Sequence, residues 1–232
     1  MADGAFASAL SMILTLDAEF VGIVGLSLRV TLAAVLIAAV IGMPLGALLA
    51  MYRFPGRGIL IVVVNALMGL PPVVAGLIVY LTLSRSGPLG ALGMLFTPTA
   101  MIVAQTILVL PIVIALTRQV VDELWSEYRD HLTSLGQTGI SAVPTLLFDA
   151  RYPLGIALLA GFGRASAEVG AVMIVGGNIA HHTRTMTTAI ALETSKGDLA
   201  LALGLGIVLL CLTFSINVVV YGASRVGRQM AG

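Results

Sequence analysis

Two ionisable side chains interrupt one of the most apolar stretches of the chain, GFGRASAEVGAVMIVGG over residues 161–177. They are Arg164 and Glu168, four residues apart, a spacing at which two side chains share one face of a helix. A charge in the middle of a bilayer costs at least about 2.5–3.5 kcal/mol unless it is paired or in contact with water. The pair therefore predicts an ion pair that fastens helix to helix, or a polar lining for a water-filled path. Both roles can hold at once.

A second group of polar residues follows directly. Gly176, Gly177 and Asn178 could end a helix and expose backbone N–H groups, which are donors that suit a tetrahedral oxyanion. An ordinary helix terminus explains the same residues equally well. The run HHTRTMTT then supplies Arg184 and two histidines, His181 and His182. The histidines have no third ligand nearby, so we expect no metal site, and contact with another protein or a polar lid is the preferred interpretation.

The amino-acid composition indicates whether water or lipid surrounds these residues. The 232 residues are 59% hydrophobic and 10% charged, with a mean hydropathy of +1.07, whereas soluble domains carry about 25% charged residues. The sequence therefore predicts an all-α integral membrane protein, since its apolar runs are continuous and its 26 glycines suit closely packed spanning helices. The net charge of +1 gives no indication of nucleic acid. The single cysteine, Cys211, excludes a disulfide or a cysteine-based metal site within one chain.

Five apolar runs approach or exceed the roughly 20 residues that cross a bilayer. We expect spanning helices at about 21–51, 59–83, 99–117, 152–177 and 199–221. Pro71 and Pro72 remove two backbone donors from the second run, and such interruptions mark the translocation core of transporters. Residues 1–20 contain a weaker apolar stretch that is too short to span, and we expect it at the membrane interface. The lack of an early Lys or Arg argues against a cleaved secretory signal.

The distribution of Lys and Arg predicts the orientation. With five spans, seven arginines fall on one side and three basic residues on the other; the seven are Arg53, Arg57, Arg118, Arg129, Arg151, Arg225 and Arg228, and the three are Arg85, Arg184 and Lys196. Cytoplasmic loops are the ones enriched in Lys and Arg. We therefore expect the N-terminus outside and the C-terminus in the cytoplasm.

The connection 118–151 is the one long polar stretch of the sequence. By composition, 118–134 predicts a helix, Gly136 and Gly139 a turn, and SAVPTLLF a second short helix with Pro144 near its start. A helix–turn–helix lying across the cytoplasmic face would suit the docking of a partner. An ordinary solvated loop is the alternative, and composition does not separate the two.

At this connection the chain resembles a known family. DHLTSLGQTGISAVPTLLFD is similar to the cytoplasmic EAA loop of ABC importer permeases, with Gly136 at the glycine position. Asp130, His131 and Leu132 stand where that loop has Glu-Ala-Ala, Leu146 falls at its Ile position, and Phe148–Asp149 replaces its Leu-Pro. Three further segments resemble the membrane subunits of the molybdate, sulfate and tungstate importers: GLPPVVAGLIVYLTLSRSGPLGALG (69–93), ILVLPIVIAL (107–116) and AEVGAVMIVGGNIAHHTRTMTTAIALETSKGDLALAL (167–203). The segments SRSGPLG and MTTAIALETSKGD most resemble those of the tungstate permeases in this family.

The resemblance implies a type I ABC importer fold, like that of the molybdate and methionine permeases, as one permease domain over 1–232. It implies a homodimer in a prokaryotic plasma membrane, with an ATPase dimer on the cytoplasmic side and an oxyanion-binding protein outside. Coupling to the ATPase would fall to Asp130, His131, Leu132, Gly136 and Leu146 within the 118–151 loop. The path or gate would include Pro71, Pro72, Arg164, Glu168, Gly176, Gly177, Asn178 and Arg184.

Other classes fit less well. A secondary anion transporter would need an internal repeat and more spans, and we find no repeat in the sequence. An intramembrane enzyme would need a nucleophile–base or metal constellation, which the spans do not offer. No nucleotide-binding glycine loop with Lys-Ser/Thr occurs, so ATP hydrolysis must belong to another chain. We therefore expect a transport subunit without a cofactor of its own, moving tungstate, or alternatively molybdate or sulfate.

Overall fold

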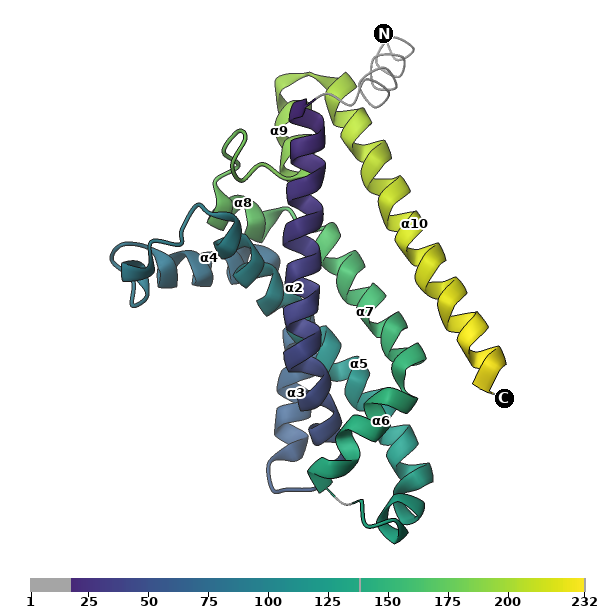
Figure 1. The fold of residues 1–232 in the computed structure, drawn as a ribbon. Helices are drawn as coiled ribbons and strands as arrows, with labels where there is room; N and C mark the ends of the chain where they lie inside the picture. Colours follow the sequence, from purple (N-terminus) through teal and green to yellow (C-terminus); the bar gives the residue numbers. More distant parts are fainter. Residues whose placement is uncertain (1–17, 138, 232) are drawn as a thin grey trace. The chain divides into compact units, whose positions relative to one another are not determined.

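Helices joined by loops and turns make up the residues that the computed structural model describes, 18–137 and 139–231 (Figure 1). The longer helices are α2 (Ala18–Met51), α5 (Pro98–Ser134) and α10 (Leu199–Ala231). The shorter elements are α3 (Arg57–Met68), α4 (Pro72–Leu83), η1 (Gly90–Leu92), η2 (Gly139–Ala142), α6 (Val143–Asp149), α7 (Arg151–Ser166), α8 (Gly170–Gly176) and α9 (Met186–Lys196).

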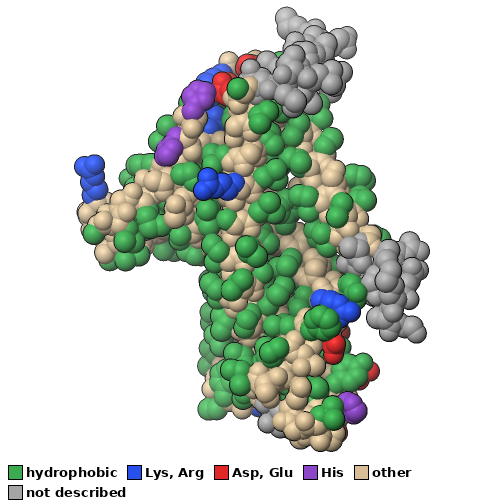
Figure 2. Space-filling view, viewed as in Figure 1, with side chains coloured by type: hydrophobic (Ala, Val, Ile, Leu, Met, Phe, Trp, Pro, Cys, Tyr) green, Lys and Arg blue, Asp and Glu red, His purple; other side chains and the backbone are tan. Residues whose placement is uncertain are grey.

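Three helices in the described residues are long and apolar enough to cross a membrane: α2, α5 and the Leu199–Gly222 part of α10. The total rises to five if two broken pairs each count as one span, α3 with α4, and Gly139–Asp149 with α7. Hydrophobic side chains cover most of the face shown in Figure 2, and charged ones are sparse on it. These observations confirm an all-α membrane protein, and the interruption expected at Pro71–Pro72 is confirmed by the break between α3 and α4.

Three boundaries differ from the sequence-based expectation. The fourth span is not one helix over 152–177, because α7 ends at Ser166 and α8 begins at Gly170. Residues 118–134 are not a separate helix lying across a face, since α5 continues through them unbroken from Pro98. The proposed interfacial segment 1–20 lies outside the described residues up to position 17, and residues 18–20 are the first turn of α2.

The described residues form two compact units, each built from non-consecutive segments. The first unit contains 18–34, 71–105 and 164–216, and the second contains 35–70, 106–163 and 217–231. Helices α2, α5, α7 and α10 supply residues to both units. The division therefore does not cut the chain into consecutive domains, and a single permease domain over 1–232 stays a prediction.

The first unit is held together by α4 packed on α8 and by an apolar cluster around α9. An ideal Cβ placed on Gly76 of α4 would lie 2.7 Å from Cα of Ala171, so these helices approach as closely as a glycine allows. The apolar cluster joins α2, α9 and α10 and contains Phe20, Ile23, Met186, Ala189 and Leu205. Ser27 reinforces it, since its Oγ accepts the N–H of Met186 at 2.7 Å.

The second unit packs α2 on α5 through two glycines one turn apart. An ideal Cβ on Gly46 would lie 2.7 Å from the carbonyl oxygen of Ile114 and 2.8 Å from Cβ of Thr117. One on Gly42 would lie 3.0 Å from Val113 Cγ1. Below this contact, a buried cluster ties α2 and α5 to η2 and α6; it contains Ala47, Ala50, Met51, Val121, Leu132, Ala142, Val143 and Leu146. The GxxxG pair thus works as a helix-packing motif.

Gly46→Ala should therefore destabilise the protein, because the added methyl group meets a backbone oxygen that cannot rotate away. Overpacking of this kind costs about 1–3 kcal/mol. Gly25→Ala is the matched control, since Gly25 lies in the same helix with no heavy atom within 4 Å of its ideal Cβ. Thermal unfolding in detergent should show a lower midpoint for Gly46→Ala alone. Equal midpoints for the two variants would mean that α2 and α5 do not approach this closely.

Candidate functional site

Glu168 lies in the break between α7 and α8, and its side chain is 2% exposed. Its Oε2 accepts a hydrogen bond from Arg164 Nη1 at 2.7 Å, and its Oε1 accepts the backbone N–H of Ala171 at 2.9 Å. Its own N–H donates to the carbonyl of Ala165 at 3.2 Å, and its carbonyl accepts the hydroxyl of Thr187 at 2.8 Å. One buried residue thereby fastens the end of α7 to the starts of α8 and α9.

Arg164 stands at the end of α7 with its side chain 29% exposed. The expected i, i+4 ion pair forms, although Glu168 lies outside the helix and not on its face. Within the described residues only Nη1 of this guanidinium forms a hydrogen bond, so most of its five N–H donors stay available for an oxygen-rich ligand. The Glu168 carboxylate is buried, as expected for an ion pair that holds helices together. The Arg164 guanidinium is partly exposed, as expected for a residue that lines a path.

The break between α3 and α4 meets the break between α7 and α8. Pro71 caps the start of α4, and its carbonyl accepts the N–H groups of Val74 and Ala75 at 3.0 and 3.1 Å. An ideal Cβ on Gly170 would lie 3.0 Å from Val73 Cγ2 and 3.6 Å from an oxygen of Glu168. The structure therefore brings the first turn of α4, which begins at Pro72, close to Glu168, although about ninety residues separate them.

Gln105 belongs to the same site, and sequence reasoning missed it. Its side chain is buried in α5, and its Nε2 donates to the carbonyl of Ala165 at 3.1 Å, beside Arg164. Its Oε1 is buried without a hydrogen-bond partner among the described residues. The signal was present in the sequence, since Gln105 is the one amide side chain within the apolar run 99–117.

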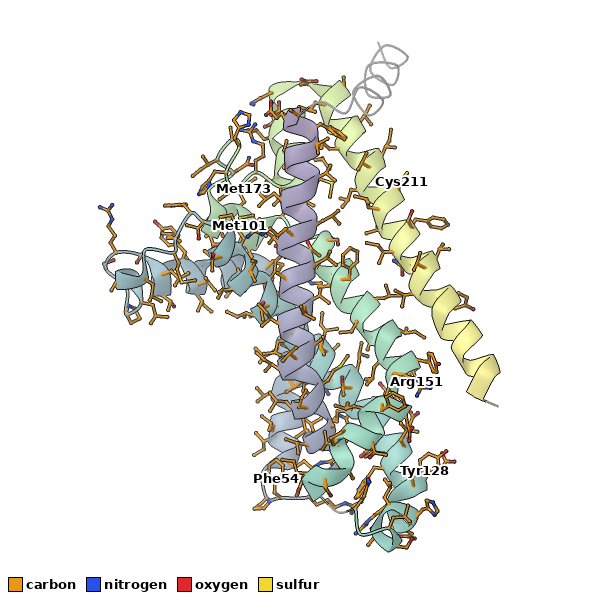
Figure 3. All side chains as sticks on the ribbon, viewed as in Figure 1. Phe54, Met101, Tyr128, Arg151, Met173 and Cys211 are labelled. Carbon is orange, nitrogen blue, oxygen red and sulfur yellow. The ribbon has the colours of Figure 1, made fainter. Side chains whose placement is uncertain are left out.

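Gly176, Gly177 and Asn178 end α8 in the manner of a helix terminus. Gly177 has a φ of +72°, and its N–H donates to the carbonyl of Met173 at 3.0 Å. The N–H of Ile179 donates to Thr183 Oγ1, whose hydroxyl in turn donates to the carbonyl of Gly176. An ideal Cβ on Gly176 would lie 3.0 Å from Sδ of Met101, the side chain labelled in Figure 3. Because these donors are engaged within the chain, the geometry favours the helix-terminus interpretation over an oxyanion cradle.

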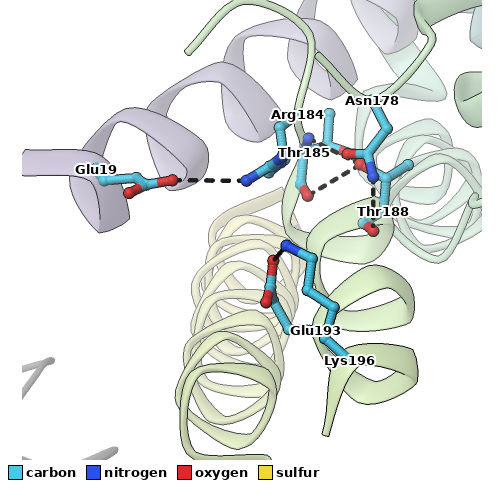
Figure 4. A network of polar contacts seen from close by, with 7 residues as sticks. All are labelled: Glu19, Asn178, Arg184, Thr185, Thr188, Glu193 and Lys196. Carbon is cyan, nitrogen blue, oxygen red and sulfur yellow. Dashed lines mark hydrogen bonds and ion pairs between the residues drawn. The ribbon is translucent and has the colours of Figure 1, made fainter. Parts of the chain in front are cut away.

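Arg184 lies in a separate polar network at the start of α9 (Figure 4). Its Nη1 is 3.6 Å from Glu19 Oε1 in the first turn of α2. Asn178 Nδ2 donates to the carbonyl of Thr188 at 3.4 Å, and Thr185 and Thr188 form a capping box for α9. Arg184 is thus paired with the start of α2, and it joins the loop after α8 to that helix.

Within the proposed coupling segment, the structure has the turn at Gly136 and the short helix after it that the sequence predicts, whereas 118–134 are the end of α5. Gly136 has a φ of +77°, its N–H donates to the carbonyl of Thr133, and the N–H of Gln137 donates to the carbonyl of Leu132. This pair of bonds is the Schellman motif, which ends a helix with a glycine in the left-handed conformation. Gly139 also has a positive φ, and η2 and α6 follow with Pro144 in the first turn of α6.

The five residues assigned to coupling divide into two groups. Leu132 and Leu146 are buried in the cluster that joins α2, α5 and α6, so they hold the segment in place. Asp130, His131 and Gly136 are exposed, and so are the large apolar side chains of Leu135 and Phe148, at 65% and 66%. An apolar surface on an otherwise polar segment is typical of a protein-binding site.

Comparison with known proteins decides the family. No protein-family model matches the chain. It is 42% identical over 202 residues to a probable anion ABC transporter permease protein of Haloferax volcanii, covering 85% of this chain and 87% of that protein. It is 40% identical over 216 residues to the tungstate uptake system permease protein TupB of Peptoclostridium acidaminophilum, covering 93% and 95%. The chain belongs to the ABC transporter permeases.

This permease also resembles the tungstate uptake system permease protein TupB of Campylobacter jejuni, at 37% identity over 174 residues, or 75% of this chain and 73% of that protein. Relatives at 28–31% identity are named sulfate transport system permeases. As an ABC permease it is a multi-pass membrane transport subunit and not an enzyme. Membership of this family excludes the secondary anion transporter.

Proposed function

We propose that this permease forms the membrane path of an ATP-driven importer for a tetrahedral oxyanion, and that the oxyanion is tungstate. The observation that carries this proposal is the similarity to a tungstate permease over 93% of the chain. Molybdate and sulfate are the alternatives, and the sulfate permeases among the more distant relatives favour the second of them.

The Arg164–Glu168 pair supports an anion path physically. A partly exposed guanidinium attracts a dianion, and the carboxylate bound to it weakens that attraction. A conducting site must bind weakly enough to release its ion. Arg164 is therefore assigned to the path, with Glu168, Pro71 and Pro72 positioning it. Gly176, Gly177, Asn178 and Arg184 shape the loop after α8.

The 118–151 segment supports coupling to an ATPase dimer. Its turn at Gly136 is exposed, and so are the apolar side chains of Leu135 and Phe148 in the same segment, which a partner would cover. We assign this side to the cytoplasm of a prokaryotic cell, with the C-terminus on the same side and the N-terminus outside. Two copies of the permease would enclose one path, and an oxyanion-binding protein would deliver the substrate from outside.

The test is ATP-dependent uptake by proteoliposomes that contain the permease with its ATPase and binding protein. Tungstate should be taken up faster than molybdate, and sulfate slowest. Arg164→Lys keeps a charge beside Glu168 and loses the planar fork that contacts two oxygens of one ligand, so it should raise KM for tungstate about 10-fold. Arg85→Gln, at an exposed arginine of the same unit, is the control.

A purely structural role of the Arg164–Glu168 ion pair predicts a different result. Because Arg164→Lys preserves the ion pair, it would then leave uptake unchanged. Sulfate uptake as fast as tungstate uptake would contradict the tungstate assignment and leave the permease assignment intact. Uptake without ATP would contradict the mechanism as a whole.

A further inference from the structure

Two cavities meet at Tyr52, in the second unit, where α2 ends. The first, of about 530 Å³, is apolar and is bounded by Leu45 and Leu49 of α2, Leu60 and Val64 of α3, and Ile114 of α5. The second, of about 730 Å³, is polar and opens between the end of α2 and the later turns of α5. Tyr52 lines both. The apolar cavity and the charged one therefore adjoin at this side chain, and the pair is called the recess below.

The charged end contains both signs. Arg57 is already engaged, since its Nε donates to the carbonyl of Leu49 at 2.8 Å and its Nη2 lies 3.4 Å from Asp122. The remaining charged side chains of the polar cavity are two cations, Arg53 and Arg129, and two carboxylates, Glu123 and Asp130. None of these four forms an ion pair within the described part of the chain.

Aromatic side chains near this recess indicate its level in the bilayer. Tyr52, Phe54, Trp125 and Tyr128 all lie near the end of α2 or on the later turns of α5, and Phe54 and Tyr128 are labelled in Figure 3. Aromatic residues next to arginines are typical of the level where hydrocarbon gives way to lipid headgroups. The apolar cavity then opens toward the hydrocarbon and the polar one toward the headgroups.

We propose that this recess binds a zwitterionic glycerophospholipid with a primary amine headgroup. One acyl chain fills the apolar cavity, the phosphate binds Arg53 and Arg129, and the ammonium binds Glu123 and Asp130 against Trp125. Charge complementarity selects the headgroup, because a purely anionic lipid would leave two carboxylates facing its phosphate. A quaternary amine could not donate hydrogen bonds to them. This inference needs only the membrane setting of the permease and not its substrate.

The test is lipid retention by the full-length permease, purified in detergent and supplied with equal amounts of dioleoyl phosphatidylethanolamine, phosphatidylcholine and phosphatidylglycerol. Native mass spectrometry should show phosphatidylethanolamine retained above the other two. Arg53→Gln should lower its retention about 5-fold, as expected for the loss of one basic contact to a lipid headgroup. Leu60→Trp, which fills the apolar cavity without touching the charges, should lower retention of all three lipids.

Arg85→Gln removes an exposed arginine from the other unit and should change nothing. Equal retention of the three headgroups, or retention that neither Arg53→Gln nor Leu60→Trp lowers, would overturn the proposal. Separation of a dimer into monomers by the same two variants, without loss of lipid, would also overturn it and would assign the recess to a second copy of the chain.

Discussion

Gly136→Arg should remove the ATPase from the purified transporter while the permease stays inserted in the membrane. An ideal Cβ on Gly136 meets no heavy atom within 4 Å, so a new side chain would point away from the permease, into the space that a docked partner would occupy. Loss of a central contact site should lower the ATPase that co-purifies with the permease at least about 10-fold. Quantitative mass spectrometry of the detergent-solubilised complex measures this ratio.

The backbone at Gly136 requires a control of its own. A non-glycine residue in the left-handed region costs about 1–3 kcal/mol, and asparagine is among the residues that tolerate it best. Gly136→Asn should therefore keep the turn, add a small side chain, and retain more of the ATPase than Gly136→Arg. If both variants co-purify with the ATPase as the wild type does, this turn is not the docking site.

Glu168→Ala should unfold more easily than the wild type and should lose uptake. The substitution leaves Arg164 without its carboxylate and the N–H of Ala171 without its acceptor, in a part of the protein where Glu168 is 2% exposed. Leaving a buried N–H without its acceptor costs about 1–3 kcal/mol, and the loss of the ion pair adds to that cost. Denaturant unfolding in mixed micelles measures the change in free energy, and proteoliposome uptake measures the change in transport.

Two variants separate stability from transport at this site. Glu168→Gln keeps an acceptor oxygen for Ala171 and removes the charge, so it should unfold less easily than Glu168→Ala and still transport poorly. Glu193→Ala breaks another pair with a buried carboxylate, 2.9 Å from Lys196 on α9, and should lower stability without changing KM. Normal uptake by Glu168→Gln would show that the negative charge has no part in transport.

The sequence predicted the helices that consist of long apolar runs. It did not predict the helix ends that depend on a single contact. The long runs gave α2, α5 and α10 to within a few residues, apart from the continuation of α5 to Ser134 and of α10 beyond 221. The end of α7 at Ser166 was not predictable, because the spacing of Arg164 and Glu168 also fits one unbroken helix over 152–177. Where the chain breaks, the Glu168 carboxylate accepts the N–H of Ala171, a contact that no sequence pattern reports.

The sequence predicted individual residues of the candidate site but not the contacts that bring them together. Arg164 and Glu168 were visible because charge is rare in apolar sequence, and Gly136 because the turn needed a glycine. The meeting of Gly170 with Val73 was not visible, since no local pattern reports a contact between segments so far apart. The burial of Leu132 and Leu146 was equally hidden, because an aligned motif does not distinguish residues that hold a segment from those that touch a partner.

The packing of α4 on α8 has a consequence for the order in which the protein can be made. Helix α4 has 12 residues and α8 has 7, so neither can cross a bilayer alone, and each covers the other's closest-packed face. Roughly ninety residues separate them, which a ribosome adds in about 5–20 s at 5–20 residues per second. During that interval the face of α4 that carries Gly76 lacks the helix that packs against it. Lipid or the insertion machinery must therefore cover this face of α4 until α8 has been synthesised and can pack against it.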